Sequence, residues 1–92
     1  MFDRVLPIGS IVLLKGGKRR VMVIGYCKYK DDDRVTIYDY AGCLYPQGFM
    51  SPEKTVLFNH EQIERIYSLG FQNEERFAFE ERLKCAIAEV KK

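Results

Sequence analysis

The segment 38–49, Tyr-Asp-Tyr-Ala-Gly-Cys-Leu-Tyr-Pro-Gln-Gly-Phe, constrains the fold more than any other part of the chain. It begins as a strand, and the pattern predicts a break at Gly42, followed by an irregular path through Pro46 and Gly48. Aromatic side chains stand next to the glycine and proline residues that direct the backbone. Such a segment builds one wall of a small barrel or a contact surface, and it does not carry the groups that an enzyme needs.

The length and the charge set limits on the class of protein. We expect the 92 residues to form one domain over 1–92, and a chain this short buries about 60–65% of its unfolded surface. The composition, 47% hydrophobic and 30% charged, is typical of a globular protein. The net charge of +2 is too small to predict nucleic acid or an anionic membrane as a partner. The charge is uneven, however, because residues 1–30 carry seven basic side chains and one acidic side chain.

The cysteines and the hydropathy indicate the compartment. Cys27, Cys43 and Cys85 are odd in number and lack CxxC spacing, so we expect neither a disulfide framework nor a zinc site. Thiols of this kind suit a reducing cytoplasm. The sequence shows no signal peptide, and no apolar run approaches the roughly 20 residues that span a bilayer. We therefore expect a cytoplasmic protein with no membrane partner.

Four segments rich in β-branched and aromatic residues predict strands at 10–15, 18–29, 34–41 and 55–58. Gly16-Gly17 separates the first two strands, which is typical of a tight hairpin. The second strand is almost continuously apolar from Val21 to Cys27, as a strand buried on both faces would be. Gly25 inside it indicates a bulge or a sharp bend. The acidic run 31–33 lacks the spacing of a calcium loop and predicts a plain polar turn.

Two helices are predicted after the strands. Asn59 with Gln62 forms a variant capping box, and Ile63, Ile66 and Tyr67 share one helical face, so we expect a short helix over 60–68. A very short fifth strand is possible at 69–71.

The last helix is predicted over 74–91. Asn73 caps it, and an apolar stripe runs along it through Phe79, Leu83, Ala86, Ile87 and Val90. The stripe covers the barrel of the same chain or meets a partner, and the first arrangement is the more common one for a terminal helix. Together these elements predict an α+β fold, with a small antiparallel, SH3-like and partly open barrel of four or five strands over 6–71.

Catalytic chemistry has little support in the sequence. His60, the only histidine, is predicted to lie on the surface in the first turn of a helix, where the macrodipole disfavours its protonated form. A Cys43, His60 and Asp39 set is conceivable but has no supporting motif. Gly16-Gly17 followed by Lys18 joins two strands, so it is not a phosphate-binding loop. We therefore expect no enzyme activity, no cofactor and no metal.

Binding residues are the remaining candidates. The aromatic side chains that would contact a protein partner are Tyr38, Tyr40, Tyr45, Phe49 and Phe77. Tyrosines are favoured at interfaces because they give a large contact area at low entropic cost. The alternative for each ring is a place in the core. The basic residues that would contact an anion or RNA are Lys15, Lys18, Arg19 and Arg20, which also fit an ordinary solvated hairpin tip.

Four motifs carry a resemblance to a known family. They are 6–12, 14–17, 38–48 and 58–63, and the third is the most specific. Together they resemble, over roughly residues 6–80, a family of small bacterial proteins known as a domain of unknown function. Members are often encoded in Gram-positive bacteria beside LXG toxins of the type VIIb secretion system. The resemblance implies a non-enzymatic accessory factor or chaperone that binds its cognate toxin, or a partner factor of that toxin, before export.

Two alternatives to this adaptor function stay open. An immunity protein would block a toxin through a charged patch, for which the basic region of residues 1–30 is the candidate. An RNA-binding barrel would use Lys15, Lys18, Arg19 and Arg20 with Tyr26 or Tyr29, and its binding would weaken steeply with salt. A homo-oligomer is also possible, and nucleic acid is the less favoured partner.

Overall fold

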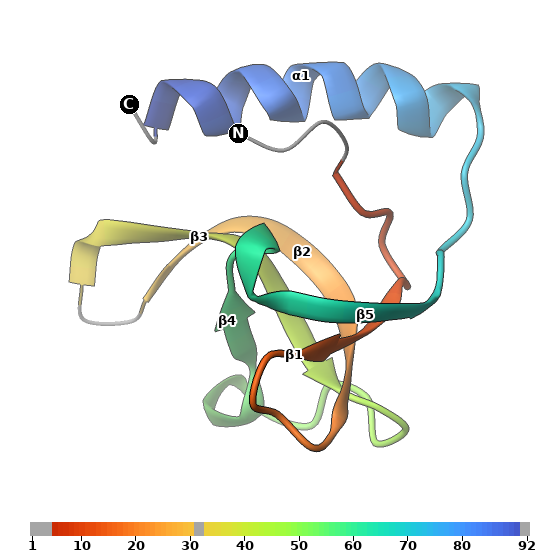
Figure 1. Cartoon of the computed structure of the whole chain (residues 1–92). Coiled ribbons are helices and arrows are strands. Elements are labelled where there is room, and N and C mark those ends of the chain that lie inside the picture. The colour runs from red at the N-terminus through yellow and green to blue at the C-terminus, as the bar shows by residue number, and fades with distance from the viewer. Residues whose placement is uncertain (1–4, 31–32, 91–92) are drawn as a thin grey trace.

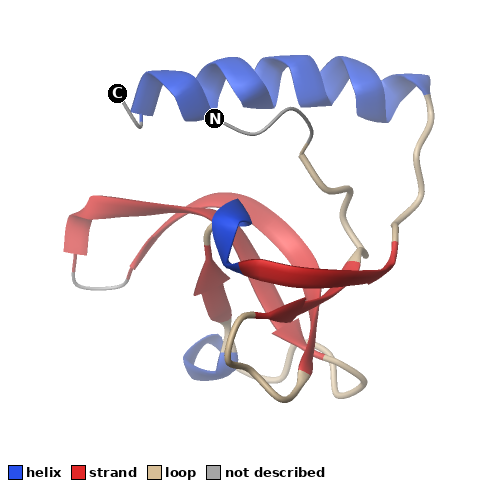
Figure 2. Cartoon of the chain, in the orientation of Figure 1, coloured by secondary structure: helices blue, strands red, loops and turns tan. Residues whose placement is uncertain are grey.

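Five antiparallel strands form one sheet in the order β4-β3-β2-β1-β5, and a long helix lies beyond the sheet (Figure 1). The computed structural model describes residues 5–30 and 33–90. The elements are β1 Ile11–Leu14, β2 Arg20–Lys30, β3 Asp33–Leu44, β4 Val56–Phe58, β5 Ile63–Ser68 and α1 Glu74–Val90, with short 3-10 turns η1 Pro52–Lys54 and η2 His60–Gln62. Figure 2 shows the strongly curved strands gathered below the helix. The predicted α+β fold with a partly open antiparallel barrel is confirmed.

The first hairpin forms at the double glycine as predicted, but residues 15–19 connect the strands, so the expected tight two-residue turn is wrong. Val12 of β1 pairs with Val21 of β2, and both side chains are buried. Gly16 adopts a positive φ of 77° in the connecting loop, a conformation that side chains disfavour. The hairpin therefore places the basic residues of the loop at the end of the barrel away from α1 (Figure 1).

Strands β2 and β3 are long and bent, and two predictions about them need correction. The register shifts between Val23 and Gly25, which confirms the expected irregularity. However, β3 does not break at Gly42 but continues to Leu44. A Cβ at Gly42 would lie 2.5 Å from Cγ1 of Val21, so this glycine permits close packing inside the sheet instead of ending a strand. Burial alternates along the start of β2, so this strand is not buried on both faces.

The predicted helix over 60–68 is wrong. Only η2 is helical, and the following residues form β5, which pairs with β1. Ile66 and Tyr67, expected to face inward from a helix, are exposed. The spacing of apolar residues over so short a segment does not distinguish a helix from a strand. The open edge of β1 supplies the backbone hydrogen bonds that make this segment a strand. Leu69 and Phe71, the candidates for a fifth strand, lie in the connection to α1.

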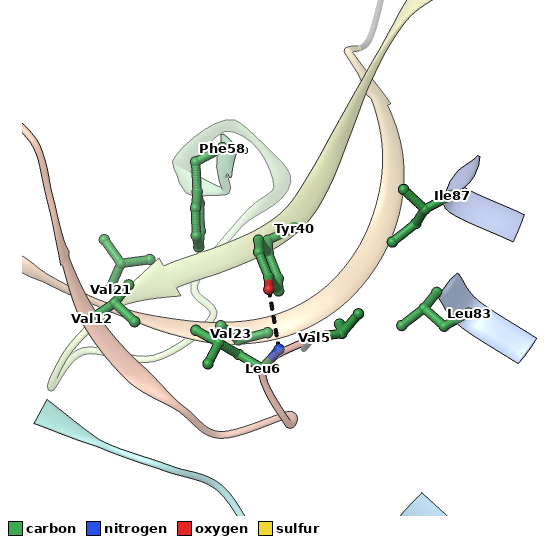
Figure 3. Close-up of a cluster of buried hydrophobic side chains, with 9 residues drawn as sticks. All are labelled: Val5, Leu6, Val12, Val21, Val23, Tyr40, Phe58, Leu83 and Ile87. Atoms are coloured by element: carbon green, nitrogen blue, oxygen red, sulfur yellow. Dashed lines mark hydrogen bonds between the residues drawn. The ribbon is translucent and has the colours of Figure 1, made fainter. Parts of the chain in front are cut away.

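The core lies between the curved sheet, the segment before β1 and one face of α1. Its buried members are Val5, Leu6, Val12, Val21, Val23, Tyr40, Phe58, Leu83 and Ile87 (Figure 3). The Tyr40 and Phe58 rings stack with centroids 5.2 Å apart. Burying the Leu83 and Ile87 side chains stabilises the docked helix by about 1.5–3 kcal/mol each. The helix thus covers its own barrel, the arrangement that the stripe favoured.

A buried ion pair reinforces this docking. The Glu80 carboxylate, 3% exposed as a residue, accepts the backbone N–H of Val5 at 2.9 Å. The guanidinium of Arg76 donates to the Val5 carbonyl and lies 3.5 Å from Glu80. Together the two side chains satisfy both polar backbone groups of one residue, as a neighbouring strand would. The helix starts where predicted, because the Asn73 side chain accepts the Arg76 N–H at 2.9 Å.

None of the helices in the described part of the chain is long and apolar enough to span a membrane.

Candidate functional site

His60 and Asp39, two members of the conceivable catalytic set, take part in a hydrogen-bond network with Tyr40. The Tyr40 hydroxyl accepts the backbone N–H of Leu6 at 3.1 Å and lies 2.7 Å from Nδ1 of His60. The Asp39 carboxylate accepts the backbone N–H of His60 at 2.9 Å, and the Asp39 N–H donates to Asn59 Oδ1 at 3.0 Å. The network therefore joins the segment before β1, strand β3 and the turn after β4.

Burial shifts the pKa values of two side chains in this network, His60 and Tyr40. Burial lowers the pKa of His60, and the Asp39 carboxylate opposes part of that shift. Burial also raises the pKa of Tyr40, which keeps its hydroxyl protonated beside the His60 ring. The prediction that His60 is a surface residue is wrong, because the ring is half-buried and bonded to Tyr40.

The remaining groups of the conceivable catalytic set are poorly accessible. Cys43 is buried in β3, so its thiol does not meet solvent. Asp39 is buried beside the η2 turn and holds backbone there. Across residues 5–30 and 33–90, no group of three or more histidine, cysteine or acidic side chains is placed to hold a metal ion.

Two hollows on the surface are better candidates. The first, which we name the basic cleft, has a volume of about 320 Å³ and is lined by Leu13, Gly17, Lys18, Arg19, Arg20, Tyr45 and Tyr67. Three lining residues are cations, and none is a carboxylate. The Tyr45 N–H donates to the Arg20 carbonyl at 2.9 Å, which holds the turn after β3 against the hairpin. The cleft therefore combines cations and phenol rings from three parts of the chain.

The second hollow, which we name the aromatic groove, lies between the connection after β5 and the first turns of α1. It has a volume of about 460 Å³, within the range of ligand pockets, and Phe71, Glu75, Arg76, Ala78, Phe79 and Arg82 are among its lining residues. Phe71 is 80% exposed and Phe79 is 47% exposed. The groove thus presents two aromatic side chains beside charged ones.

The comparisons with known proteins identify the family. The family model described as Domain of unknown function (DUF4176) matches residues 5–79. The chain belongs to this DUF4176 family. Neither a curated protein nor a solved structure matches the chain. The matched span contains the whole sheet, all residues of the basic cleft, and both phenylalanines of the aromatic groove.

The structure places the aromatic candidates of the DUF4176 domain in different environments. Tyr40 is 0% exposed, so it is a core residue and is unavailable to a partner in this fold. Tyr38 is half-buried. Tyr45, Phe49 and Phe77 are exposed, and of these only Tyr45 lines a described hollow, the basic cleft.

The basic candidates lie together at the hairpin. Lys15, Lys18, Arg19 and Arg20 are all exposed, and the last three line the basic cleft.

Sequence reasoning missed several residues of both hollows. Tyr67 was assigned to the inner face of a helix that does not form, whereas it lines the basic cleft. Phe71 was treated as part of a possible strand and Phe79 as part of the buried stripe, yet both are exposed in the aromatic groove. Phe71 lies between Gly70 and Gln72 in a segment without strand periodicity. This local pattern was the one indication in the sequence that its ring is exposed.

Proposed function

We propose that this DUF4176 protein is a non-enzymatic adaptor or chaperone. In this proposal it binds a cognate LXG toxin, or a partner factor of that toxin, in the cytoplasm before export by the type VII secretion system. The resemblance of segments 38–48 and 58–63 to proteins encoded beside such toxins supports the partner. The exposed aromatic residues on the surface of the molecule support a binding function.

The exposed rings of the aromatic groove carry this proposal. A Phe side chain that is 80% exposed is costly to leave in water, and its burial in a complex is favourable by about 1.5–3 kcal/mol. Phe71 and Phe79 line the same hollow, which suits one apolar element of a partner. Arg82 and Glu75 at the same hollow supply the polar rim that protein interfaces share.

The groove is also built on a firm support. The Arg76 backbone is held by the Asn73 cap, and the Arg76 side chain is held by Glu80 and Val5. Because the wall of the groove is fixed before binding, little ordering entropy is lost when a partner docks. A toxin segment would therefore dock in the groove without unfolding the adaptor.

The proposal is tested by co-expressing the tagged chain with the LXG toxin encoded beside it. We expect the toxin to co-purify with the chain in a defined ratio at moderate salt. Phe71→Ser/Phe79→Ser should reduce the retained toxin about tenfold or more, because exposed aromatic anchors dominate interface energies. The matched control is Met50→Ser, which removes an exposed apolar side chain outside the groove and should retain the toxin.

Two outcomes would count against the proposal at different levels. If no LXG toxin or partner factor is retained by the wild-type chain, the adaptor function is wrong. If the toxin is retained equally by the wild-type chain and the groove variant, the function stands but the groove is not the contact surface. Unfolding midpoints measured for all variants separate lost binding from lost folding.

A further inference from the structure

We infer that the basic cleft binds a short acidic segment of a protein, with Arg20 as the main carboxylate-binding residue. This inference concerns a second surface, and it does not depend on the aromatic groove or on the proposed toxin. The basic cleft and the aromatic groove share no lining residue.

The sheet register assembles the cations of this surface. Leu13 of β1 pairs with Arg20 of β2 on one side and with Arg65 of β5 on the other. Directly paired residues of antiparallel strands project from the same face, so the two arginines flank Leu13. This row of residues forms only because β5 is a strand.

Tyr67 holds the guanidinium groups in place. The guanidinium carbon of Arg20 lies 4.6 Å from the centroid of the Tyr67 ring, and that of Arg65 lies 5.8 Å from it. An arginine stacked on a ring keeps its N–H donors free at the edge of its plane, where they suit bidentate binding of a carboxylate. The Tyr67 ring therefore restricts Arg20 to fewer rotamers before binding. Less side-chain entropy is then lost when a carboxylate binds.

The charge of the cleft is not neutralised within the described structure. Lys18, Arg19 and Arg20 line it, and no carboxylate does. The ion pairs found among the described residues involve Arg76, Lys84 and Glu80 on α1, not the cleft. Exposed cations grouped without a counter-charge attract anionic partners over about one Debye length, which is roughly 10 Å at moderate salt.

An acidic protein segment fits the cleft better than single-stranded nucleic acid. Nucleic-acid grooves offer several successive rings on which bases stack. Here the Tyr67 ring is already engaged by Arg20, which leaves Tyr45 as the second ring of the cleft. A volume of about 320 Å³ accepts a few side chains and not a long strand. Carboxylates would pair with Arg20 and Lys18, and an adjoining apolar side chain would contact Tyr45 and Leu13.

The test is fluorescence anisotropy of labelled octaglutamate with the full chain, compared with octaglutamine and octauridylate. We expect octaglutamate to bind at low salt and weaken as salt rises, octaglutamine not to bind, and octauridylate to bind more weakly than octaglutamate. Lys18→Gln/Arg20→Gln should weaken octaglutamate about tenfold. Tyr67→Leu should weaken it about twofold to fivefold, because Arg20 loses its support.

The first control variant loses the same number of positive charges as the cleft variant. Lys54→Gln/Arg82→Gln also removes two exposed cations, neither of which lines the basic cleft, and should change affinity within about twofold. Phe71→Ser/Phe79→Ser should leave octaglutamate binding unchanged, which separates this inference from the proposed function. The inference is overturned if octaglutamate fails to bind at low salt, if the two charge-removing variants lose affinity equally, or if octauridylate binds more tightly.

Discussion

Two charged clusters in the described part of the chain differ in burial and in pairing. Arg76 and Glu80 are nearly buried, are paired with each other, and hold the backbone of Val5. Lys18 and Arg20 are exposed at the hairpin and form no ion pair among the described residues. Burial without a partner is costly for a charge, whereas an exposed charge has little effect on the fold. The first cluster therefore serves folding, and the second is available for binding.

The largest expected effect comes from breaking the buried pair. Glu80→Ala should reduce the free energy of unfolding by about 3 kcal/mol, because it leaves Arg76 and the Val5 N–H buried without their acceptor. Urea unfolding measures this change, and Glu81→Ala on the exposed side of the helix should stay within about 0.5 kcal/mol. Equal stability of the two variants would show that the pair does not hold the helix.

A smaller loss should follow from removing one hydroxyl in the core. Tyr40→Phe keeps the ring but removes the group that bonds Leu6 and His60, so we expect a loss of about 1–2 kcal/mol. Tyr45→Phe, the matched change in the exposed basic cleft, should leave the unfolding midpoint unchanged. A comparable loss in both variants would place Tyr45 in the fold and remove it from the binding surface.

The third effect depends on pH. Because the pKa of His60 is lowered in the folded protein, the unfolded chain binds its proton more readily. Stability is therefore fully present above the unfolded pKa of about 6.5 and falls as pH drops through that value towards the lowered folded pKa. Thermal midpoints measured from pH 7.5 to 5 should fall for the wild-type chain and fall less for His60→Gln. Parallel curves for the two proteins would contradict the role of His60.

The smallest expected effect is at the second cluster. Lys18→Gln/Arg20→Gln should change the free energy of unfolding by no more than about 1 kcal/mol, because both side chains are exposed and only the contact of Arg20 with Tyr67 is lost. Urea unfolding in low and high salt provides the measurement. A large loss of stability here would remove the contrast between the two clusters.

Features encoded by neighbouring residues were predictable from the sequence. The double glycine predicted the first hairpin, and Asn73 predicted the start of α1. The partly open barrel followed from the number and spacing of the apolar segments. Each of these depends on turn or cap chemistry that acts over a few residues.

Features that depend on distant contacts were not predictable. Strand β5 forms because the edge of β1 is free to pair with it. The spacing of the apolar residues within β5 fits a helix as well as a strand. Tyr40 and Tyr45 look alike in sequence, but long-range packing buries one against Phe58 and leaves the other in a cleft. Glu80 is buried where its carboxylate accepts the Val5 N–H, a contact between the two ends of the chain that no local pattern indicates.

Amide hydrogen exchange tests most directly whether a partner binds at the exposed aromatic groove and leaves the sheet unchanged. The exchange of the free chain is compared with that of its complex with the LXG toxin proposed as its partner. We predict slower exchange in the connection after β5 and in the first turns of α1, and unchanged exchange in β2 and β3. Protection that avoids residues 69–82, or faster exchange in β2 and β3, would contradict this account.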